Sequence, residues 1–461
     1  MIKKLLKNNI LLSTSSFISL IINVISIPII TRIYTPENIG IFVSLQIISM
    51  ILFPLLSMRM EIIFGQKIKI SEIKTLFSTV SIIGLLVGFL LFSILFIASS
   101  FLNQETILSY FIFIVLLSFF LVYFEFGIGI LNRLRLYQYI AIFSAMNIFF
   151  QRGLQIILGL IFEDKVLAIF LSYCLSNFLL IFSMYFIVHK RINIFTNIDF
   201  NFNILKKYYN HIFYRVIYTL GNLFKDRLLI LIIISFYSTS LAGLYTQSLS
   251  LLAIPVLVFS NPLKTIITRE FSENKIDTIN MIIIIYNLLI FSLVPFYIFF
   301  FFHSYQIFQI VLGQNWTELS GIFNIMLFPM LILIFSSSLD RMYDVLNIQK
   351  WALFFELFFG ITIFLLFLLL SINNYEFLFS MKINAIVLSI FFSLFLCFGL
   401  WKSGHIERFK NSFILFITHF IFCGGIFYYL RMSLMESLIV LIVLELVGLV
   451  LFRKLIKQFL N

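Results

Sequence analysis

Long apolar stretches follow one another through this chain with very little polar sequence between them. A helix of about 20 residues spans the ~30 Å hydrocarbon core of a bilayer, and fourteen stretches reach that length. They lie near residues 10–33, 39–58, 76–102, 107–131, 139–162, 166–189, 211–236, 241–263, 281–302, 320–346, 352–372, 383–401, 412–430 and 433–452. The pattern predicts an all-α polytopic membrane protein with about fourteen transmembrane helices.

Composition strengthens this prediction. Hydrophobic residues make up 62% of the chain and charged residues only 11%, whereas roughly a quarter of a soluble domain is charged. The first apolar stretch is longer than a signal-peptide core and leads into a second, so we expect it to be retained as a helix. Cys174, Cys397 and Cys423 all fall inside predicted spans and form no metal or disulfide pattern. The sequence therefore indicates no metal and no cofactor.

The basic residues alternate with the loops. The chain carries 32 Lys and Arg residues and a net charge of +12, and 25 of these basic residues fall on the side of the N-terminus. The opposite loops hold only Arg32, Lys165, Lys382 and Arg431. By the positive-inside rule both termini are cytoplasmic. The same distribution explains the positive charge without a nucleic-acid partner, and none is expected.

The loops are too short to form a catalytic domain. The longest predicted connections are 190–210 on the cytoplasmic side and 303–319 outside. The sequence also lacks a phosphate-binding Gly-rich loop ending in GK[ST], an H-E-x-x-H pair and a G-x-S-x-G elbow. A membrane enzyme, such as an O-antigen polymerase or acyltransferase, is thus the less favoured class, and we predict that the protein is not an enzyme.

Two short matches indicate an internal duplication. Residues 34–42 resemble residues 237–245 at an offset of 203, and Leu131-Asn132 resembles Leu346-Asn347 at an offset of 215. Because six spans separate the copies, both enter the membrane in the same direction, which gives a parallel repeat related by a pseudo-twofold axis along the membrane normal. We expect a six-helix bundle at 1–189, a basic linker at 190–210, a second bundle at 211–401 and two added helices with a basic tail at 402–461.

Ionisable residues inside the predicted spans are the best site candidates, because each costs roughly 2.5–3.5 kcal/mol to insert. Arg152 lies near the middle of its span, and a guanidinium there suits bidentate recognition of phosphate. Lys225, Asp226 and Arg227 follow one another in the seventh span, where an ion pair that only fixes helix packing is an open alternative. Glu125 lies in the inner part of the fourth span. Three more candidates lie near span ends: Arg32, Glu61 and Asp340.

Several motifs carry a family resemblance. The segments are ITRIYTPENIG at 30–40, RMEIIFGQ at 59–66, KDRLLILIIISFYSTSLAGLYTQSLSLL at 225–252 and LGQNWTELSGIFNIML at 312–327. In this order they resemble the Wzx-type O-antigen and polysaccharide flippases of the multidrug/oligosaccharidyl-lipid/polysaccharide exporter superfamily. The last two spans match in hydropathy alone.

The resemblance implies two six-helix bundles around a cationic lumen, in a bacterial inner membrane. It implies translocation of an undecaprenyl-diphosphate-linked oligosaccharide from the cytoplasmic to the periplasmic leaflet, with membrane lipids, a polymerase and a chain-length regulator as further partners. Arg152, Arg227 and Arg32 would line the lumen, with Lys225 beside them. Asp226, Glu125 and Asp340 would be lumen acids, as would Glu61, and H⁺ or Na⁺ coupling is left open. A multidrug or cation antiporter of the same superfamily is the alternative transporter; its cationic ligands fit arginines less well.

Overall fold

The computed structural model describes residues 2–64, 69–101, 105–194, 200–260, 275–339, 342–343, 346, 348–404, 406–430 and 433–446. Within these ranges every regular element is a helix. The chain divides into two compact units, Met1–Gly243 and Leu244–Asn461. This boundary follows the seventh predicted span, whereas the boundaries expected from the duplication, around 190–210, remain a prediction.

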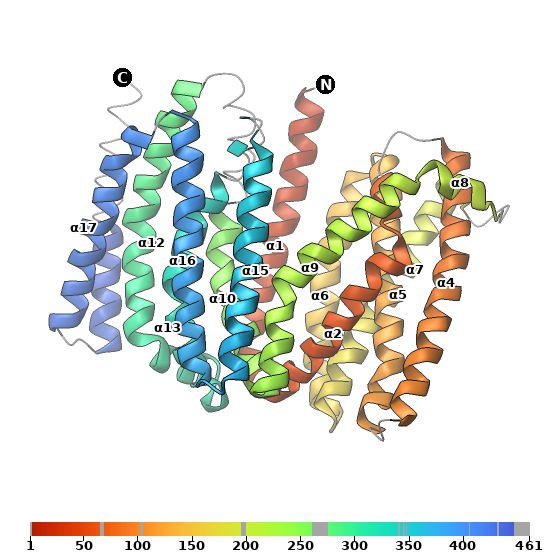
Figure 1. Ribbon diagram of the computed structural model, residues 1–461, viewed down its shortest axis with the longest axis horizontal. Helices are drawn as coiled ribbons and strands as arrows, with labels where there is room; N and C mark the ends of the chain where they lie inside the picture. Colours follow the sequence, from red (N-terminus) through yellow and green to blue (C-terminus); the bar gives the residue numbers. More distant parts are fainter. Residues whose placement is uncertain are drawn as a thin grey trace. The chain divides into compact units, whose positions relative to one another are not determined.

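The first unit contains nine helices among its described residues. They are α1 (Ile2–Ile33), α2 (Pro36–Ser57), α3 (Met60–Phe64), α4 (Ile70–Phe101), α5 (Glu105–Arg133), α6 (Tyr137–Ile161), α7 (Lys165–Ile192), α8 (Phe202–Lys207) and α9 (Tyr209–Phe236). Figure 1 shows α4, α5, α6 and α7 as upright rods, with α2 and α9 inclined. α1 packs on α6, α5 and α6 pack on α7, and α2 packs on both α5 and α9.

Helix α10 (Thr239–Pro255) crosses the boundary into the second unit and continues as the π-helix η1 (Val256–Ser260). The proline at the junction has no N–H to donate, which favours the wider π turn. The unit continues with α12 (Lys275–Val311), the 3₁₀ helix η2 (Gln314–Trp316), α13 (Leu319–Ser338), α15 (Gln349–Ile372), α16 (Phe377–Lys402), α17 (Ile406–Leu430) and helical residues 434–446. α12 packs on α13 and α17, and α16 packs on α13 and α15.

Helices occupy the described parts of all fourteen predicted ranges, which confirms the all-α membrane fold. Among the described residues, twelve helices are long and apolar enough to span a bilayer. α9 and residues 434–446 are not among them, so the count of fourteen stays a prediction. One predicted end is wrong: the stretch 320–346 leaves the α-helix at Ser338. There the Leu339 N–H donates to the carbonyls of Ser336 and Ser337, which closes the last turn tightly.

Local sequence sets several helix ends. α2 begins with Thr35 as N-cap and Pro36 at the first helical position, where its missing N–H has no intrahelical partner to lose. The Thr35 side chain accepts a hydrogen bond from the Asn38 N–H, and the Asn38 side chain in turn accepts one from the Thr35 N–H. α7 begins with Asp164, which accepts from the N–H groups of Val166 and Leu167. These caps fix where the chain enters each helix.

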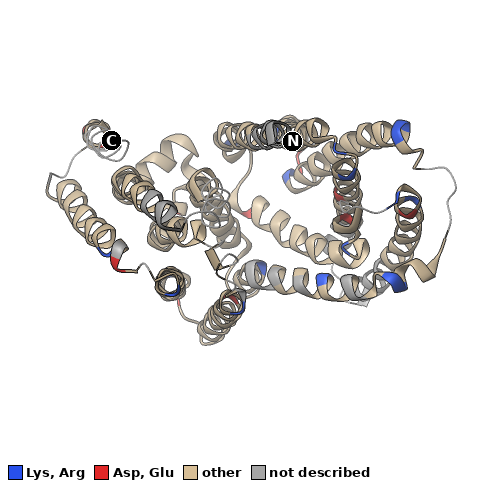
Figure 2. Ribbon diagram, turned by 90° about the horizontal axis from the view of Figure 1, so that it is seen from above, with Lys and Arg blue, Asp and Glu red and all other residues tan. Residues whose placement is uncertain are grey.

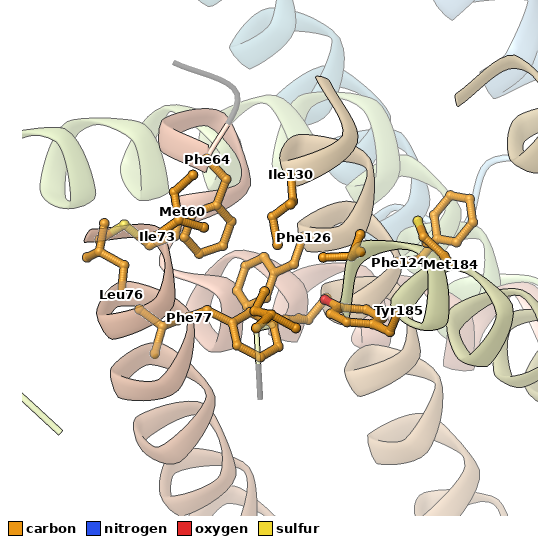
Figure 3. Packing of buried hydrophobic residues seen from close by; sticks show 14 of the residues in the cluster. Met60, Phe64, Ile73, Leu76, Phe77, Phe124, Phe126, Ile130, Met184 and Tyr185 are labelled. Carbon is orange, nitrogen blue, oxygen red and sulfur yellow. The ribbon is translucent and has the colours of Figure 1, made fainter. Parts of the chain in front are cut away.

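The core of the first unit is aromatic and aliphatic. Phe126, Phe77 and Tyr185 point toward one another in Figure 3, with Met60 and Phe64 of the short α3 packed at the edge of the same cluster. The Phe77 ring lies 6.1 Å from that of Phe126 and 5.6 Å from that of Tyr185. The cluster therefore joins α3, α4, α5 and α7.

In the second unit, buried hydroxyl groups join the helices. The Tyr286 hydroxyl of α12 donates to the Phe335 carbonyl at 2.6 Å, and the Ser260 hydroxyl donates to the Ile334 carbonyl at 2.9 Å. The Tyr343 hydroxyl likewise donates to the Phe395 carbonyl of α16. α13 and the residues just after it thus form the centre of this unit.

The two glycines that the duplication equates meet each other. A Cβ on Gly40 would lie 1.8 Å from the Thr239 carbonyl oxygen, and a Cβ on Gly243 would lie 1.9 Å from the Pro36 carbonyl oxygen. Pro36 and Thr239 are separated by the same offset of 203 residues as the two glycines. Such a reciprocal contact is what a local twofold axis between equivalent segments produces.

Candidate functional site

The first candidate site is built around Arg152 of α6. Its Nε donates to the Asn23 Oδ1 of α1 at 2.9 Å, and its Nη1 donates to the Gln155 Oε1 at 2.9 Å. Gln155 is itself buried, and its backbone carbonyl accepts a 2.6 Å hydrogen bond from the buried Tyr34 hydroxyl. The Tyr34 ring reaches α6 because Gly159 has no side chain in its path. The guanidinium is therefore held by a network that ties α1 to α6.

Both groups that accept hydrogen bonds from Arg152 are neutral side-chain amides. No carboxylate among the described residues pairs with Arg152, since the ion pairs there are Arg59 with Glu61 and Lys207 with Glu72. A guanidinium has five N–H donors. Two of those on the half-buried Arg152 side chain bond to Asn23 and Gln155, and the other three make no hydrogen bond to the described residues. Arg152 thus places an uncompensated positive charge, with donors to spare, within a candidate membrane span.

Arg227 of α9 is the second arginine of the predicted spans. It is half-buried and makes no ion pair with the described residues. Arg152 lies nine residues before the end of α6, and Arg227 lies nine residues before the end of α9. At 1.5 Å per residue both lie about 13 Å from these ends. Figure 2 shows that charged residues are sparse along the described helices.

A separate cluster joins Arg59, Glu61 and Glu125. Met58 and Arg59 both adopt left-handed backbone conformations after α2, which turns the chain into α3. Arg59 Nη1 then lies 2.8 Å from Glu61 Oε1. Glu125 of α5 interacts electrostatically with both residues. α3 approaches α5 closely because residue 129 is glycine. A Cβ added to Gly129 would lie 2.5 Å from the Glu61 carbonyl oxygen.

The Glu61 side chain is buried, and burial raises its pKa from the usual 4.5 to about 7. The Arg59 charge opposes this shift, and the nearby Glu125 adds to it. A carboxyl group with a pKa near neutrality exchanges its proton at physiological pH. The cluster can therefore change charge under cellular conditions.

The structure separates the candidate residues into groups. Glu61 and Glu125 come together, while Arg152 and Arg227 lie on α6 and α9. Arg32 is exposed at the C-terminal end of α1. The side chains of Lys225 and Asp226 lie outside the described residues, as does the whole of Asp340.

Sequence reasoning did not select Asn23 or Gln155. Asn23 and Gln155 were detectable as amides within apolar stretches, a weaker signal than a charge. Their role depends on the α1–α6 packing, which the sequence does not reveal.

The described residues contain no group of three His, Cys, Asp or Glu side chains that could hold a metal ion. The two candidate sites consist of fixed guanidinium groups, amides and a titratable carboxyl group. Such an arrangement can bind anions and protons.

Comparison with known proteins identifies the family. Residues 11–321 match the family model of the polysaccharide biosynthesis proteins, which is well over half of the chain. The chain belongs to this family. No curated protein matches this polysaccharide biosynthesis protein in sequence.

Solved structures share its fold. The structure titled lipid II flippase MurJ, in an inward closed conformation, has a TM-score of 0.71 and 15% identity, over 97% of this chain and 100% of that one. An inward-facing multidrug resistance MATE family transporter of the MOP superfamily has a TM-score of 0.59 and 14% identity, over 85% and 96% of the two chains. At these identities the likeness establishes the fold. The polysaccharide biosynthesis protein thus shares its fold with these two transporter structures.

Proposed function

We propose that this polysaccharide biosynthesis protein flips an undecaprenyl-diphosphate-linked oligosaccharide from the cytoplasmic to the periplasmic leaflet of a bacterial inner membrane. The family, the fold and the intramembrane arginines support the proposal. The observation that carries it is the guanidinium of Arg152, which neutral amides position and no described carboxylate neutralises. A diphosphate supplies the missing negative charge, and its oxygens match the fork of N–H donors.

The physical need for such a protein is clear. A charged diphosphate with a hydrophilic glycan does not cross hydrocarbon unaided, whereas its isoprenoid tail can stay in lipid. Arg152 and Arg227 would hold the diphosphate at similar depth, and neighbouring amides and hydroxyls would contact sugar. Proton exchange at Glu61, with Glu125 beside it, is a candidate for coupling transport to an ion gradient.

Arginine substitutions test the anion site. We expect Arg152→Ala and Arg227→Ala each to lower surface polysaccharide by roughly tenfold or more, the scale of one lost charge-assisted hydrogen bond. Arg152→Lys keeps the charge but loses the fork, so an intermediate loss is expected. Arg215→Ala is the matched control, because Arg215 is exposed near the start of the same helix as Arg227. Normal display in both alanine variants, at equal protein levels, would rule out this assignment.

Deletion of the protein separates flipping from the alternatives. We expect completed lipid-linked units to accumulate on the cytoplasmic face, as detected by leaflet-selective labelling of the glycan. Single units on the outer face would point to a defect in polymerisation. No accumulation, together with sensitivity to cationic drugs, would favour the multidrug antiporter suggested by the MATE-like fold.

A further inference from the structure

A large apolar cavity lies in the second unit, between α16 and α17. Its volume is about 1010 Å³, within the range of sites that hold whole small ligands. α16 packs on α13 and α17 packs on α12, whereas these two consecutive helices barely touch each other. The space between them is therefore open, with α12 and α13 as its floor. Exposed apolar side chains such as Leu394 and Phe413 line its mouth.

The depth of the cavity matches one leaflet of a bilayer. Its lining runs from Ser389 to Leu400 on α16 and from Ile406 to Ile417 on α17. Each run rises about 16 Å, close to half of a ~30 Å hydrocarbon core. Just beyond Leu400, the Lys402 ammonium lies 4.4 Å from the centroid of the exposed Trp401 ring. Trp and Lys at a helix end mark the membrane–water interface, so the cavity extends from this interface toward the bilayer centre.

The interfacial end of the cavity presents one acid and one base. Glu407 and Lys410 both line it and are exposed. They are three residues apart on α17, which places them on one face of the helix about 5–6 Å apart at their Cβ atoms. No ion pair joins these two described side chains. Since neither charge neutralises the other, the rim is complementary to a ligand that carries a positive and a negative group close together.

We propose that the cavity binds a phospholipid with an amino headgroup from the leaflet beside the 402–410 connection. An acyl chain would fill the space between α16 and α17, the phosphate would contact Lys410, and the ammonium would contact Glu407. A bare fatty acid has no group for Glu407. The proposal does not depend on the proposed function, because the cavity is lined by residues of the second unit, whereas Arg152 and Arg227 lie in the first. Bound lipid would fill the space between α16 and α17 and keep the two helices at a fixed distance from each other.

Native mass spectrometry of the purified full-length protein tests the proposal. The protein would be exchanged into detergent with equal amounts of phosphatidylethanolamine, phosphatidylcholine and phosphatidylglycerol, and retained lipids would be counted. We expect one phosphatidylethanolamine to be retained preferentially. Glu407→Gln should reduce its preference over phosphatidylcholine by roughly fivefold, and Lys410→Gln should weaken retention of all three lipids by a similar factor. Glu318→Gln and Lys382→Gln, both exposed outside the cavity, are the controls.

A cavity-filling substitution provides an independent arm. Ser393→Trp should displace the retained lipid, while Thr418→Trp, on an exposed part of α17 outside the cavity, should not. Equal lipid retention by Ser393→Trp and the wild-type protein would overturn the proposal. So would an unchanged preference in Glu407→Gln, which alters only an exposed residue and gives an answer even where Ser393→Trp does not fold. Preference for phosphatidylglycerol in the wild-type protein would equally contradict it.

Discussion

The hydrogen-bond partners of Arg152 are neutral amides, so they position its guanidinium without neutralising the positive charge. An aspartate at position 23 would have almost the same shape as the asparagine that accepts from the Arg152 Nε at 2.9 Å. It would, however, form an ion pair and neutralise the guanidinium. We expect Asn23→Asp to lower polysaccharide display severalfold, although Arg152 remains and the thermal stability of the protein does not fall.

The control for this variant is Asn201→Asp. Asn201 is the N-cap of α8 and accepts a hydrogen bond from the Asn203 N–H, a role that aspartate fills equally well. Its display should match the wild type. If Asn23→Asp also exports normally, an uncompensated charge at Arg152 is not needed and the phosphate-binding role is wrong.

Glu61 makes stability depend on pH. Because burial raises its pKa to about 7 in the folded protein from about 4.5, the folded state keeps a proton that the unfolded chain releases. The contribution of Glu61 to the free energy of unfolding is therefore most favourable below about pH 4.5 and falls as the pH rises through 7, by at most about 3 kcal/mol. In detergent, we expect the Tm of the wild type to fall between pH 5 and pH 8.

The comparison that isolates this effect is Glu61→Gln, which cannot ionise. Its Tm should fall less over the same pH range, because the glutamine side chain releases no proton. Glu318→Gln, at an exposed position, should follow the wild type. An identical pH dependence in Glu61→Gln and the wild type would assign the titration to other groups.

At the scale of elements, the reciprocal glycine contact joins the start of α2 to the start of α10. Gly40→Ala would place a methyl group 1.8 Å from the Thr239 carbonyl oxygen. Since the obstacle is backbone, relief requires a shift of a whole helix end, and we expect a loss of about 2 kcal/mol or more. Gly221→Ala in α9 is the control, because its Cβ meets nothing within 4 Å. It should be neutral or stabilising by up to about 1 kcal/mol. Equal Tm values for the two variants would contradict a tight crossing.

Sequence patterns predicted these elements well, since a membrane imposes both the length and the apolar composition of a spanning helix. The error at 320–346 has a physical cause. The predicted span was carried past Leu339 over three charged residues, Asp340, Arg341 and Asp344, whereas the helix ends where the Leu339 N–H turns back to the carbonyls of Ser336 and Ser337. Hydropathy measures the fit of a segment to lipid and contains no information on such local hydrogen bonds. The predicted duplication equated Gly40 with Gly243, and the contact between them explains why glycine is needed at both positions.

The site was only partly predictable, because it depends on tertiary packing. A charge such as Arg152 stands out against an apolar stretch, and its cost of insertion makes it a candidate. Its partner Asn23 lies 129 residues away on α1, and only the fold brings the two together. The same holds for Glu61 and Glu125, which share one cluster because α3 lies against Gly129 of α5. Sequence therefore identifies intramembrane charges but not which of them act together.

At the scale of the whole molecule, the crossing of the membrane by α9 decides the topology of everything after it. Among the described residues between Lys207 and Asn374, four candidate spans accompany α9, namely Thr239–Ser260, Ile282–Val311, Leu319–Ser338 and Lys350–Ile372. Five crossings place Lys207 and Asn374 on opposite sides, and four place them on the same side. The excess of basic residues in alternate loops favours five.

Reporter fusions would show directly on which side of the membrane each loop lies, and therefore whether α9 crosses. We expect green fluorescent protein to fluoresce when fused after Lys207, Gly404 or Asn461, and alkaline phosphatase to be active after Asp164 or Asn374. Fusions after Asp164 and Lys207 differ by α7 alone, so they calibrate the assay independently of α9. Phosphatase activity after Gly404, with fluorescence after Lys207, would mean that α9 does not cross. Arg227 would then lie near a membrane surface and could not share the diphosphate with Arg152, which would leave Arg152 as the proposed anion site without Arg227.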